Sequence, residues 1–379
     1  MGIARVCHSL LALALCGCAL RGPPPKVFRT YMLGLGGGER YSAWFGDERA
    51  GVIYFGLSPF WSQYHAHGGD PTADLLEPSA HAIGRFDVAH EAFLPPLIAR
   101  RPGPDSRSSV WDVLAHPNGW VYYTTYFEEM GRVRPGMGDV ERFDSLGPGL
   151  NEIALGPDLN LYVTRYGAGG KDGGVAVISP EGALLREVAL HVRKGVVTAP
   201  KSIAVDPLSG EVWLNADVIA PDKSVTFAAF HLGPDLAVRE RFDPPYELEF
   251  MAFDATGRGF FVAERAGRLG LRVVRAGTEL LTVDLGPREP HDFAQDIHFA
   301  PDGTAVIAFW SGRVEVVRQT GGNYEHARIQ LERPKECVTE NDPSLFYSAF
   351  VSDGSVYATL TCDAAIVRAP LPERYQVSR

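Results

Sequence analysis

Two short clusters of histidine and aspartate are the first candidates for chemistry in this sequence. His65-Ala-His67 is followed by Asp70, and His291-Asp292 is followed by Asp296. In an extended segment, residues i and i+2 point to the same side, so His65 and His67 would form half of a metal site. A polar loop with incidental histidines is the interpretation we favour for both.

No other catalytic arrangement stands out. The sequence shows no Ser/His/Asp set, no Cys/His set and no zinc-finger spacing. Gly34–Gly38 precedes no helical pattern, so these glycines are interpreted as a linker and not as a phosphate-binding loop. Catalytic residues are therefore left unassigned.

A further group of residues recurs at a regular interval. One series lies at the starts of short apolar segments. A second series lies at the ends of the segments that follow them, and both series are expected on the same face of the fold. The first series is Arg40, Trp111, Asn151, Lys201, Glu249, Gln295 and Phe346, and the second is Phe127, Arg165, Asn215, Glu264 and Trp310. If these segments surround a channel, its mouth is the expected ligand site.

The residues predicted to bind a ligand at this mouth are nine of these. They are Trp111, Asn151, Lys201, Glu249, Gln295, Phe346, Arg165, Glu264 and Trp310. Aromatic side chains in this set suit a sugar, a peptide or another amphipathic ligand. An ion pair between Lys201 and Glu249 is expected to fill the centre. The alternative is that these residues only fill the channel and contact the solvent there, without binding a ligand.

The elements that must position these residues belong to an internal repeat. Each copy is an apolar strand, a tight Asp/Gly-type turn and a second apolar strand. A repeat of about 40–50 residues without helical periodicity is typical of a β-propeller. We predict an all-β, seven-bladed propeller of four-stranded antiparallel blades, or six blades if the weakest copy is not one. The copies are Ser42–Gly56 (the weakest), Val113–Thr125, Asn151–Arg165, Ile203–Asn215, Met251–Glu264, Gln295–Phe309 and Ser348–Thr361.

The third blade illustrates the predicted layout. Its strands are expected at Asn151–Gly156, Leu161–Arg165, Val175–Ser179 and Leu185–Leu190. The first blade carries an insertion at about 60–80, and the second blade has a short or missing outer strand. The last blade lacks a fourth strand after Ala365–Pro370, which Val27–Leu33 could supply, removing the exposed sheet edges.

Composition excludes some function classes. The formal net charge is −10, and the basic residues are scattered along the chain. A nucleic-acid partner is therefore not expected. The 41 glycines and 28 prolines fit a protein that is dense in turns.

The N-terminus has the pattern of an export signal. Arg5 precedes a short apolar stretch, Val6–Leu15, which is too short to span a bilayer. Leu15-Cys16-Gly17-Cys18 resembles the lipobox of bacterial lipoproteins, with Cys18 as the lipidated residue. An ordinary signal peptide is the alternative. The predicted divisions are a signal peptide (1–17), a proline-rich tether (18–26), one propeller domain (27–371) and a tail (372–379).

Two further cysteines, Cys337 and Cys362, remain after this signal. Both flank strands of the last blade on the same predicted face. In an exported protein such a pair suggests a disulfide bond, and two buried free thiols are the alternative.

Three phrases of the repeat resemble known propeller families. The segments NEIALGPDLNLYVT, APKSIAVDPLSGEVWLN and APDGTAVIAF are similar to NHL repeats, to the gluconolactonase/regucalcin family and to streptogramin B lyases. The resemblance covers most of residues 110–360 and lies in turn and strand chemistry that these families share. It implies the fold more strongly than any activity.

The lactonase resemblance implies a divalent metal at the mouth, held by oxygen ligands. Asn151 matches one ligand position and Glu249 is a second candidate, which would suit calcium or magnesium. Lys201 and Trp111 stand where the family pattern would need further ligands. The lyase resemblance implies a catalytic histidine at an inner-strand start and a glutamate after it; Glu264 fits the latter, but Glu249 occupies the histidine position.

The sequence thus predicts an exported, lipid-anchored propeller that binds a small ligand or a protein partner without assigned catalysis. A metal-dependent lactonase/esterase-like hydrolase or a lyase is the alternative. No cofactor is assigned, although calcium or magnesium is compatible with the mouth. The chain is expected to be monomeric and anchored to a bacterial membrane, the outer membrane being favoured.

Overall fold

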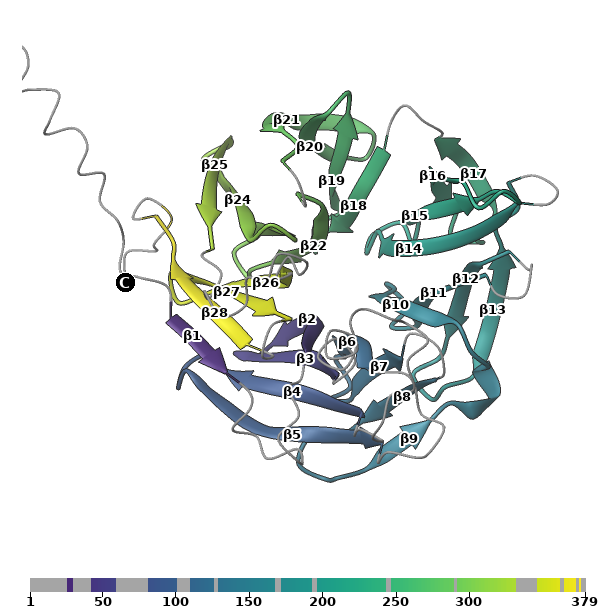
Figure 1. Cartoon of the computed structure of the whole chain (residues 1–379), viewed down its shortest axis with the longest axis horizontal. Coiled ribbons are helices and arrows are strands. Elements are labelled where there is room, and N and C mark those ends of the chain that lie inside the picture. The colour runs from purple at the N-terminus through teal and green to yellow at the C-terminus, as the bar shows by residue number, and fades with distance from the viewer. Residues whose placement is uncertain are drawn as a thin grey trace, which may run out of the picture.

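The chain forms a ring of seven four-stranded antiparallel sheets, the blades of a β-propeller. Figure 1 shows the computed structural model with the blades arranged radially around a common centre. The structure describes residues 26–29, 42–58, 81–100, 110–125, 129–167, 172–192, 196–242, 247–289, 292–331, 346–361, 365–372 and 375. The seven-bladed prediction is therefore confirmed.

Blades 1 to 4 follow one another along the chain, each running from the channel outward. Blade 1 contains β2 (Ser42–Arg49), β3 (Val52–Ser58), β4 (His81–Asp87) and β5 (Ala92–Arg100). Blade 2 contains β6 (Val110–Ala115), β7 (Val121–Thr125), β8 (Met130–Val133) and β9 (Val140–Arg142), followed by the short 3-10 helix η2 (Asp144–Leu146). Blade 3 contains β10 (Leu150–Leu155), β11 (Leu161–Arg165), β12 (Gly174–Ile178) and β13 (Leu184–Ala189). Blade 4 contains β14 (Val197–Val205), β15 (Val212–Ile219), β16 (Val225–Leu232) and β17 (Val238–Phe242).

Blades 5 to 7 complete the ring. Blade 5 contains β18 (Glu247–Phe253), β19 (Arg258–Arg265), β20 (Arg268–Arg275) and β21 (Thr278–Pro287). Blade 6 contains β22 (Ala294–Phe299), β23 (Ala305–Phe309), β24 (Arg313–Thr320) and β25 (Asn323–Gln330). Blade 7 contains β26 (Phe346–Ser352), β27 (Ser355–Leu360), β28 (Ala365–Pro370) and the N-terminal strand β1 (Lys26–Arg29).

The closure of the ring also agrees with the sequence pattern. The strand β1 pairs antiparallel with β28, from Lys26 opposite Arg368 to Arg29 opposite Ala365. Figure 1 shows this junction, where the purple N-terminal strand lies beside the yellow last strand. The third-blade strands lie within one residue of their predicted bounds, and β9, the outer strand of blade 2, has only three residues.

Tight turns join the first two strands of the blades. In blade 6, the turn contains Asp302 and Gly303, and Gly303 has a φ of 80°. The Thr304 N–H donates to the Asp302 carboxylate at 2.9 Å, and Gly303 N–H donates to Ala300 O at 2.8 Å. Glycine reaches this left-handed backbone conformation without steric cost, which explains the recurring Asp/Gly-type turns.

Every inner strand carries an irregularity near its start. The strand register shifts between Val110 and Asp112 in β6, between Pro200 and Ser202 in β14, and between Leu248 and Phe250 in β18. The strands β2, β10, β22 and β26 shift at the corresponding place. A β-bulge of this kind leaves a residue unpaired and redirects its side chain. The seven bulges therefore aim one set of side chains into the channel mouth.

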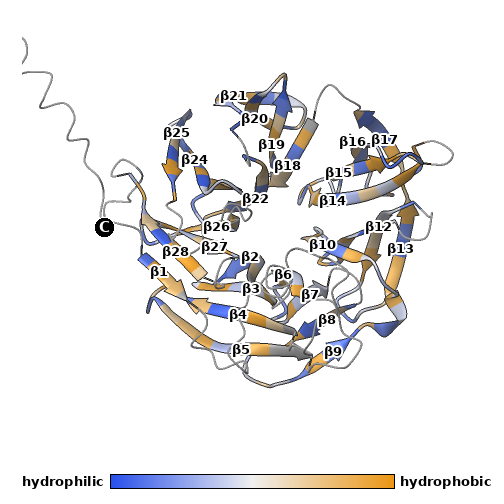
Figure 2. Ribbon diagram, in the orientation of Figure 1, coloured by the Kyte–Doolittle hydropathy of each residue, from blue (hydrophilic) through white to orange (hydrophobic). Residues whose placement is uncertain are grey.

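The core lies between the blades. Most buried clusters combine side chains of two neighbouring blades, such as Val175 and Val177 of blade 3 with Ile203 and Val205 of blade 4. Figure 2 shows hydrophobic residues spread through all the blades around the ring. Burial between blades therefore stabilises the ring as a whole, by about 25 cal/mol for each Å² of apolar surface removed from water.

Several sequence predictions fall outside the described residues. These are the signal peptide and tether, Cys18, Cys337, Cys362, Arg40, Phe127, His65, His67, Asp70, His291, the Gly34–Gly38 linker and the insertion at 60–80. Within the described segments, no helix is long and apolar enough to cross a membrane.

Candidate functional site

A cavity of about 390 Å³ opens at the channel mouth, where the inner strands begin. It contains six of the nine residues that the sequence predicts for a ligand site: Trp111, Asn151, Lys201, Glu249, Gln295 and Trp310. Other residues complete its wall, namely Phe45, Glu152, Tyr166, Ser202, Asn215, Phe250, Phe293, Ala294 and Tyr347. We name this cavity the mouth site.

The β-bulges explain why these residues gather. Trp111, Lys201 and Glu249 are the residues that the strand registers skip in β6, β14 and β18. Gln295 has the same place in β22. Because these residues leave the regular alternation of the strand, their side chains reach the channel from several blades at one level.

One half of the mouth is aromatic. Phe45 of blade 1 packs against Trp111 of blade 2, with ring centroids 5.4 Å apart, and against Tyr347 of blade 7 at 4.9 Å. Tyr347 contacts Trp310 of blade 6 at 6.2 Å, and Trp310 contacts Phe293 at 5.4 Å. A continuous aromatic arc therefore extends over blades 2, 1, 7 and 6.

The other half of the mouth is polar, and its charges are paired. Lys201 Nζ lies 2.8 Å from Asp217 Oδ1. Arg288 lies 3.1 Å from Glu249 and 3.6 Å from Glu264, and its guanidinium stands 4.0 Å from the centre of the Phe293 ring. The expected ion pair between Lys201 and Glu249 is therefore wrong. Each charge has a different partner, which leaves the centre of the mouth open.

Two buried polar atoms of the mouth site have no hydrogen-bond partner among the described residues. One is Asn151 Oδ1, in a side chain that is only 3% exposed, and the other is the indole Nε1 of Trp310. A buried polar atom without a partner costs free energy, so such atoms in a cavity wall commonly mark where a ligand binds. Asn151 offers an acceptor and Trp310 a donor.

Three predicted residues lie elsewhere. Phe346 is 1% exposed and belongs to the core of blades 6 and 7, because it pairs with Leu360 before the bulge; its neighbour Tyr347 faces the mouth instead. Arg165 forms an ion pair with Glu187 and donates hydrogen bonds to the carbonyl groups of Leu146 and Pro148. Glu264 lies beside Arg288, outside the cavity wall.

The mouth residues do not suit a divalent cation. Glu249 Oε1 faces Arg288, and its Oε2 accepts a hydrogen bond from the Ala294 N–H at 2.8 Å. Among the described residues, no group of three or more His, Cys, Asp or Glu side chains is arranged to hold a metal ion. Asn151 is an oxygen donor, but calcium or magnesium would need several such donors around it.

The lower channel holds a second group of titratable side chains, of which only Asp296 is among the candidates named from the sequence. Asp47, Asp112, Asp296 and His298 line a cavity of about 390 Å³ there, and Glu152 borders both this cavity and the mouth site. Asp112 accepts hydrogen bonds from the Val113 and Ile153 N–H groups, each at 2.8 Å. The bond from Ile153 connects the neighbouring inner strands β6 and β10, which gives the Asp112 carboxyl group a structural role.

Crowding of these carboxyl groups changes their acidity. Burial, with the negative charges of Asp296 and Asp47, raises the pKa of Asp112 to about 8, although two backbone hydrogen bonds oppose the change. Burial also raises the pKa of Glu152 well above its usual range. Burial by itself would lower the pKa of His298, but the charge and hydrogen bond of Asp296, 2.7 Å away, raise it to about 9. The channel therefore holds protons at neutral pH.

The sequence analysis missed part of the aromatic arc. Phe45, Phe293 and Tyr347 lie in or next to the inner-strand starts. Tyr347 follows the predicted Phe346, Phe293 lies two residues before Gln295, and Phe45 lies five residues after Arg40. Allowance for one bulge per inner strand leads from Phe346 to Tyr347. Phe45 also requires the first copy of the repeat to be aligned on the bulge between Ala43 and Gly46.

Comparison with protein-family models and with curated proteins finds no match. Several solved structures are similar in fold. A catalytically inactive virginiamycin B lyase from Staphylococcus aureus with quinupristin has a TM-score of 0.57 and 11% identity, covering 92% of this chain and 100% of that one. A streptogramin B lyase has a TM-score of 0.54 and 12% identity, covering 91% and 97%. YCF48 bound to D1 peptide has a TM-score of 0.54 and 15% identity, covering 95% and 99%. Identities this low establish a shared propeller fold alone.

Proposed function

We propose that this protein is a binding propeller whose mouth site holds a peptide segment with an aromatic or apolar side chain. The observation that carries the proposal is the division of the mouth into an aromatic arc and a polar half. The arc offers apolar surface for a side chain, and the polar half offers partners for a main chain.

The two unpaired atoms support a peptide in particular. A peptide group carries one acceptor and one donor, and the mouth presents the Trp310 indole N–H and Asn151 Oδ1. The size of the cavity, about 390 Å³, suits a few residues and not a folded domain. The YCF48 structure, which is described as bound to D1 peptide, is a fold-level parallel.

A peptide array tests this proposal. Acetylated and amidated hexapeptides, each containing one Trp, Phe or Leu, are screened against the protein, and the best is titrated by calorimetry. Trp310→Phe keeps a ring but loses the donor, so we expect affinity to fall by roughly 2- to 12-fold, the equivalent of one neutral hydrogen bond. The matched control is Trp120→Phe, because Trp120 lies under Arg132, away from the mouth. No binding in the array, or equal affinity in Trp310→Phe, would contradict the proposal.

The alternative function, a metal-dependent hydrolase or lyase, has less support. The carboxylate of Glu249 is engaged by Arg288 and by the Ala294 N–H, and Glu264 also lies beside Arg288. The decisive measurement is the metal content of protein purified without chelator, followed by calcium and magnesium titration. Stoichiometric metal that is lost in Asn151→Ala would establish the alternative, and we expect none.

The proposal includes export and lipid anchoring. Arg5, the apolar stretch Val6–Leu15 and Cys18 support it, as described for the sequence. Cys18→Ser should move the protein from the membrane fraction to the soluble fraction of the producing cells. If the wild-type protein is already soluble and carries no lipid by mass spectrometry, the ordinary signal peptide is the correct interpretation.

A disulfide between Cys337 and Cys362 would lower the intact mass by about 2 Da relative to the reduced chain.

A further inference from the structure

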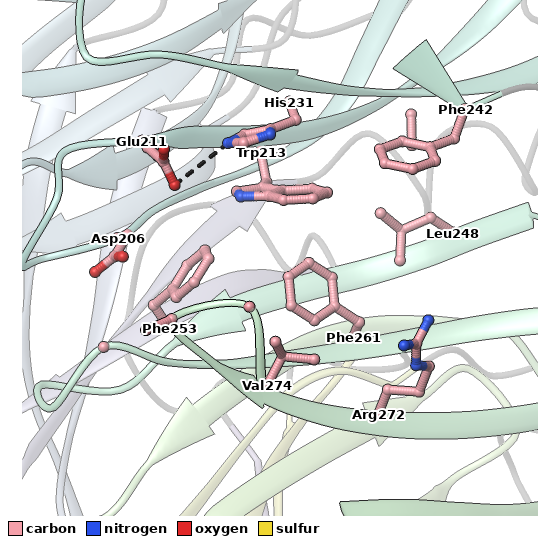
Figure 3. Close-up of a pocket in the computed structure, with 14 residues that line it drawn as sticks. Asp206, Glu211, Trp213, His231, Phe242, Leu248, Phe253, Phe261, Arg272 and Val274 are labelled. Atoms are coloured by element: carbon pink, nitrogen blue, oxygen red, sulfur yellow. Dashed lines mark ion pairs between the residues drawn. The ribbon is translucent and has the colours of Figure 1, made fainter. Parts of the chain in front are cut away.

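A third cavity lies between blades 4 and 5, outside the central channel, and the proposed function makes no use of it. Its volume is about 340 Å³. Figure 3 shows Trp213, His231 and Phe242 of blade 4 on one side and Phe253, Phe261 and Val274 of blade 5 on the other. We name it the inter-blade pocket.

The pocket exists because one position of the repeat is too small. Ala229 lines it, and the strand registers of five other blades place larger apolar residues at the position of Ala229. These are Met130, Val175, Leu271, Val314 and Ile366, and all are fully buried. Blade 4 therefore lacks the side chain that fills the corresponding space elsewhere in the ring.

Two neighbouring positions also differ from the repeat, but by carrying larger and more polar side chains. His231 stands where blade 3 has Val177 and blade 5 has Val273, which are both fully buried. Trp213 stands where blades 3 and 5 have Tyr162 and Phe260, each at most 3% exposed. In blade 4 both side chains remain partly exposed to the pocket. The small size of Ala229 thus accounts for the hollow, while Trp213 and His231 give it an aromatic and polar wall.

The walls of the pocket are suited to a flat aromatic ring. Trp213 stacks on His231 with centroids 4.2 Å apart and an interplanar angle of 12°. Phe242 is nearly parallel to Trp213 at 5.8 Å, and Phe261 meets Trp213 edge-on at 5.1 Å. Aromatic pairs favour such offset and edge-to-face contacts, so a ligand ring would extend the existing arrangement.

The charges around the pocket favour a cation. Asp206 and Glu211 lie at one end, and Glu211 Oε2 is 3.3 Å from His231 Nε2. Arg272, at the other end, forms an ion pair with Glu279 at 2.8 Å. The Arg272 charge is therefore balanced. At the opposite end Glu211 pairs with His231, and the Asp206 carboxylate accepts hydrogen bonds from the Leu208 N–H at 2.9 Å and the Ser209 hydroxyl at 2.7 Å. Two negative groups therefore stand at this end, with one histidine beside them. A positive group there gains from both the carboxylates and the aromatic faces.

We infer that the inter-blade pocket is a second binding site, for a small aromatic molecule with a positively charged amine end. The ring of the ligand inserts beside Trp213 and Phe261, in the space that Ala229 leaves. The ammonium group lies at the Asp206 and Glu211 end. This inference is independent of the proposed function, because the mouth site and the inter-blade pocket share no lining residue.

Calorimetric titration of the whole protein with tryptamine tests the inference. Indole-3-propionate is the matched probe, since it carries a similar ring and chain with a negative end. We expect saturable tryptamine binding and at least about threefold weaker binding of the acid. No tryptamine binding, or equal binding of the two probes, would overturn the inference.

Variants locate the binding. Ala229→Leu copies blade 5 and fills the pocket, so tryptamine affinity should fall at least about tenfold while the melting temperature stays level or rises. Ala229→Val, which copies blade 3, is the smaller change to use if leucine prevents folding. Glu211→Gln should weaken the binding of tryptamine but not that of indole-3-propionate. Trp310→Ala should leave the affinity for tryptamine unchanged. Unchanged affinity in a folded Ala229 variant, or loss in Trp310→Ala, would mean that the pocket is only a packing defect.

Discussion

His298 and Asp112 have raised pKa values in the same cavity, and this has a consequence for stability. Charged groups from four inner strands face them: Asp47 and Arg49 from β2, Asp112 from β6, Glu152 from β10, and Asp296 beside His298 in β22. In an unfolded chain the pKa would be near 4 for Asp112 and 6.5 for His298, whereas in the fold they are about 8 and 9. The folded state therefore binds protons more tightly than the unfolded chain.

We expect the unfolding free energy to fall as pH rises. The contribution of Asp112 is fully present below about pH 4 and is lost by about pH 8, and that of His298 is fully present below about 6.5 and is lost by about 9. Urea unfolding at several pH values between 6.5 and 9 checks this, with His298→Gln expected to flatten the slope. His90→Gln is the control, because His90 is on the surface. A wild-type unfolding free energy that stays constant over this range would contradict the expectation.

A buried ion-pair network in blade 6 offers a second test of how much a single side chain contributes to the unfolding free energy. Arg313 lies 2.6 Å from Asp292 and 2.6 Å from Glu315, and all three are at most 4% exposed. Arg313→Met would leave buried carboxylates without this partner, so we expect a loss of about 3–5 kcal/mol in unfolding free energy.

Arg328 is the matched control for that substitution. It contacts the same Glu315 carboxylate at 2.7 Å, but its side chain is 49% exposed. Arg328→Met should therefore cost less than about 1 kcal/mol. If the two substitutions have equal effects in urea unfolding, burial is not what distinguishes the two pairs.

At the scale of elements, the repeat made the blades predictable and left the details of the inner strands open. The Asp/Gly-type turns mark the ends of strands, and these local signals do not depend on the rest of the fold. A β-bulge, in contrast, depends on how a strand pairs with its neighbour. The predicted position of the residue that faces the mouth can therefore be wrong by one at each bulge. This explains why Phe346 was predicted at the mouth in place of Tyr347.

The ion-pair partners of long charged side chains could not be predicted from the sequence. Lys201 and Glu249 occupy equivalent positions in adjacent blades, which suggested a direct ion pair. The sequence did not reveal that Asp217 of β15 and Arg288, which follows β21, lie nearer to them. The inter-blade pocket was missed for a similar reason, since it depends on the size of Ala229 relative to its counterparts in other blades.

The strand β1 stabilises the contact between blade 7 and blade 1 through one aromatic residue. Phe28 is partly buried and packs against Phe86 of blade 1 with ring centroids 5.0 Å apart. Phe28→Ala should lower the unfolding free energy by about 2–3 kcal/mol, since the side chain is large but not fully buried. Lys26→Ala removes only an exposed ion pair with Glu91 and should cost less than about 1 kcal/mol. Equal losses for the two variants in urea unfolding would argue against a packing role for Phe28.

At the scale of the whole molecule, β1 also protects the ring from its own edge. Without it, β28 would present unpaired backbone groups to solvent, and such edges pair with other chains. Protein that starts at residue 30 should therefore melt at a lower temperature and associate at high concentration. Light scattering during size-exclusion chromatography checks the association, with protein starting at residue 26 as the control. A shortened protein that stays monomeric and equally stable would mean that β1 is dispensable.

The pairing of β1 with β28 also sets an order in time. Lys26 leaves the ribosome before its partner Arg368, which is synthesised only after almost the whole ring. At about 5–20 residues per second, the first strand waits roughly 20 to 70 s before its partner is synthesised. Each intermediate blade can pair its own four strands during that interval, but blade 7 cannot. Synthesis that stops before residue 365 thus yields an open ring with an unpaired first strand, a species that quality-control proteases can recognise.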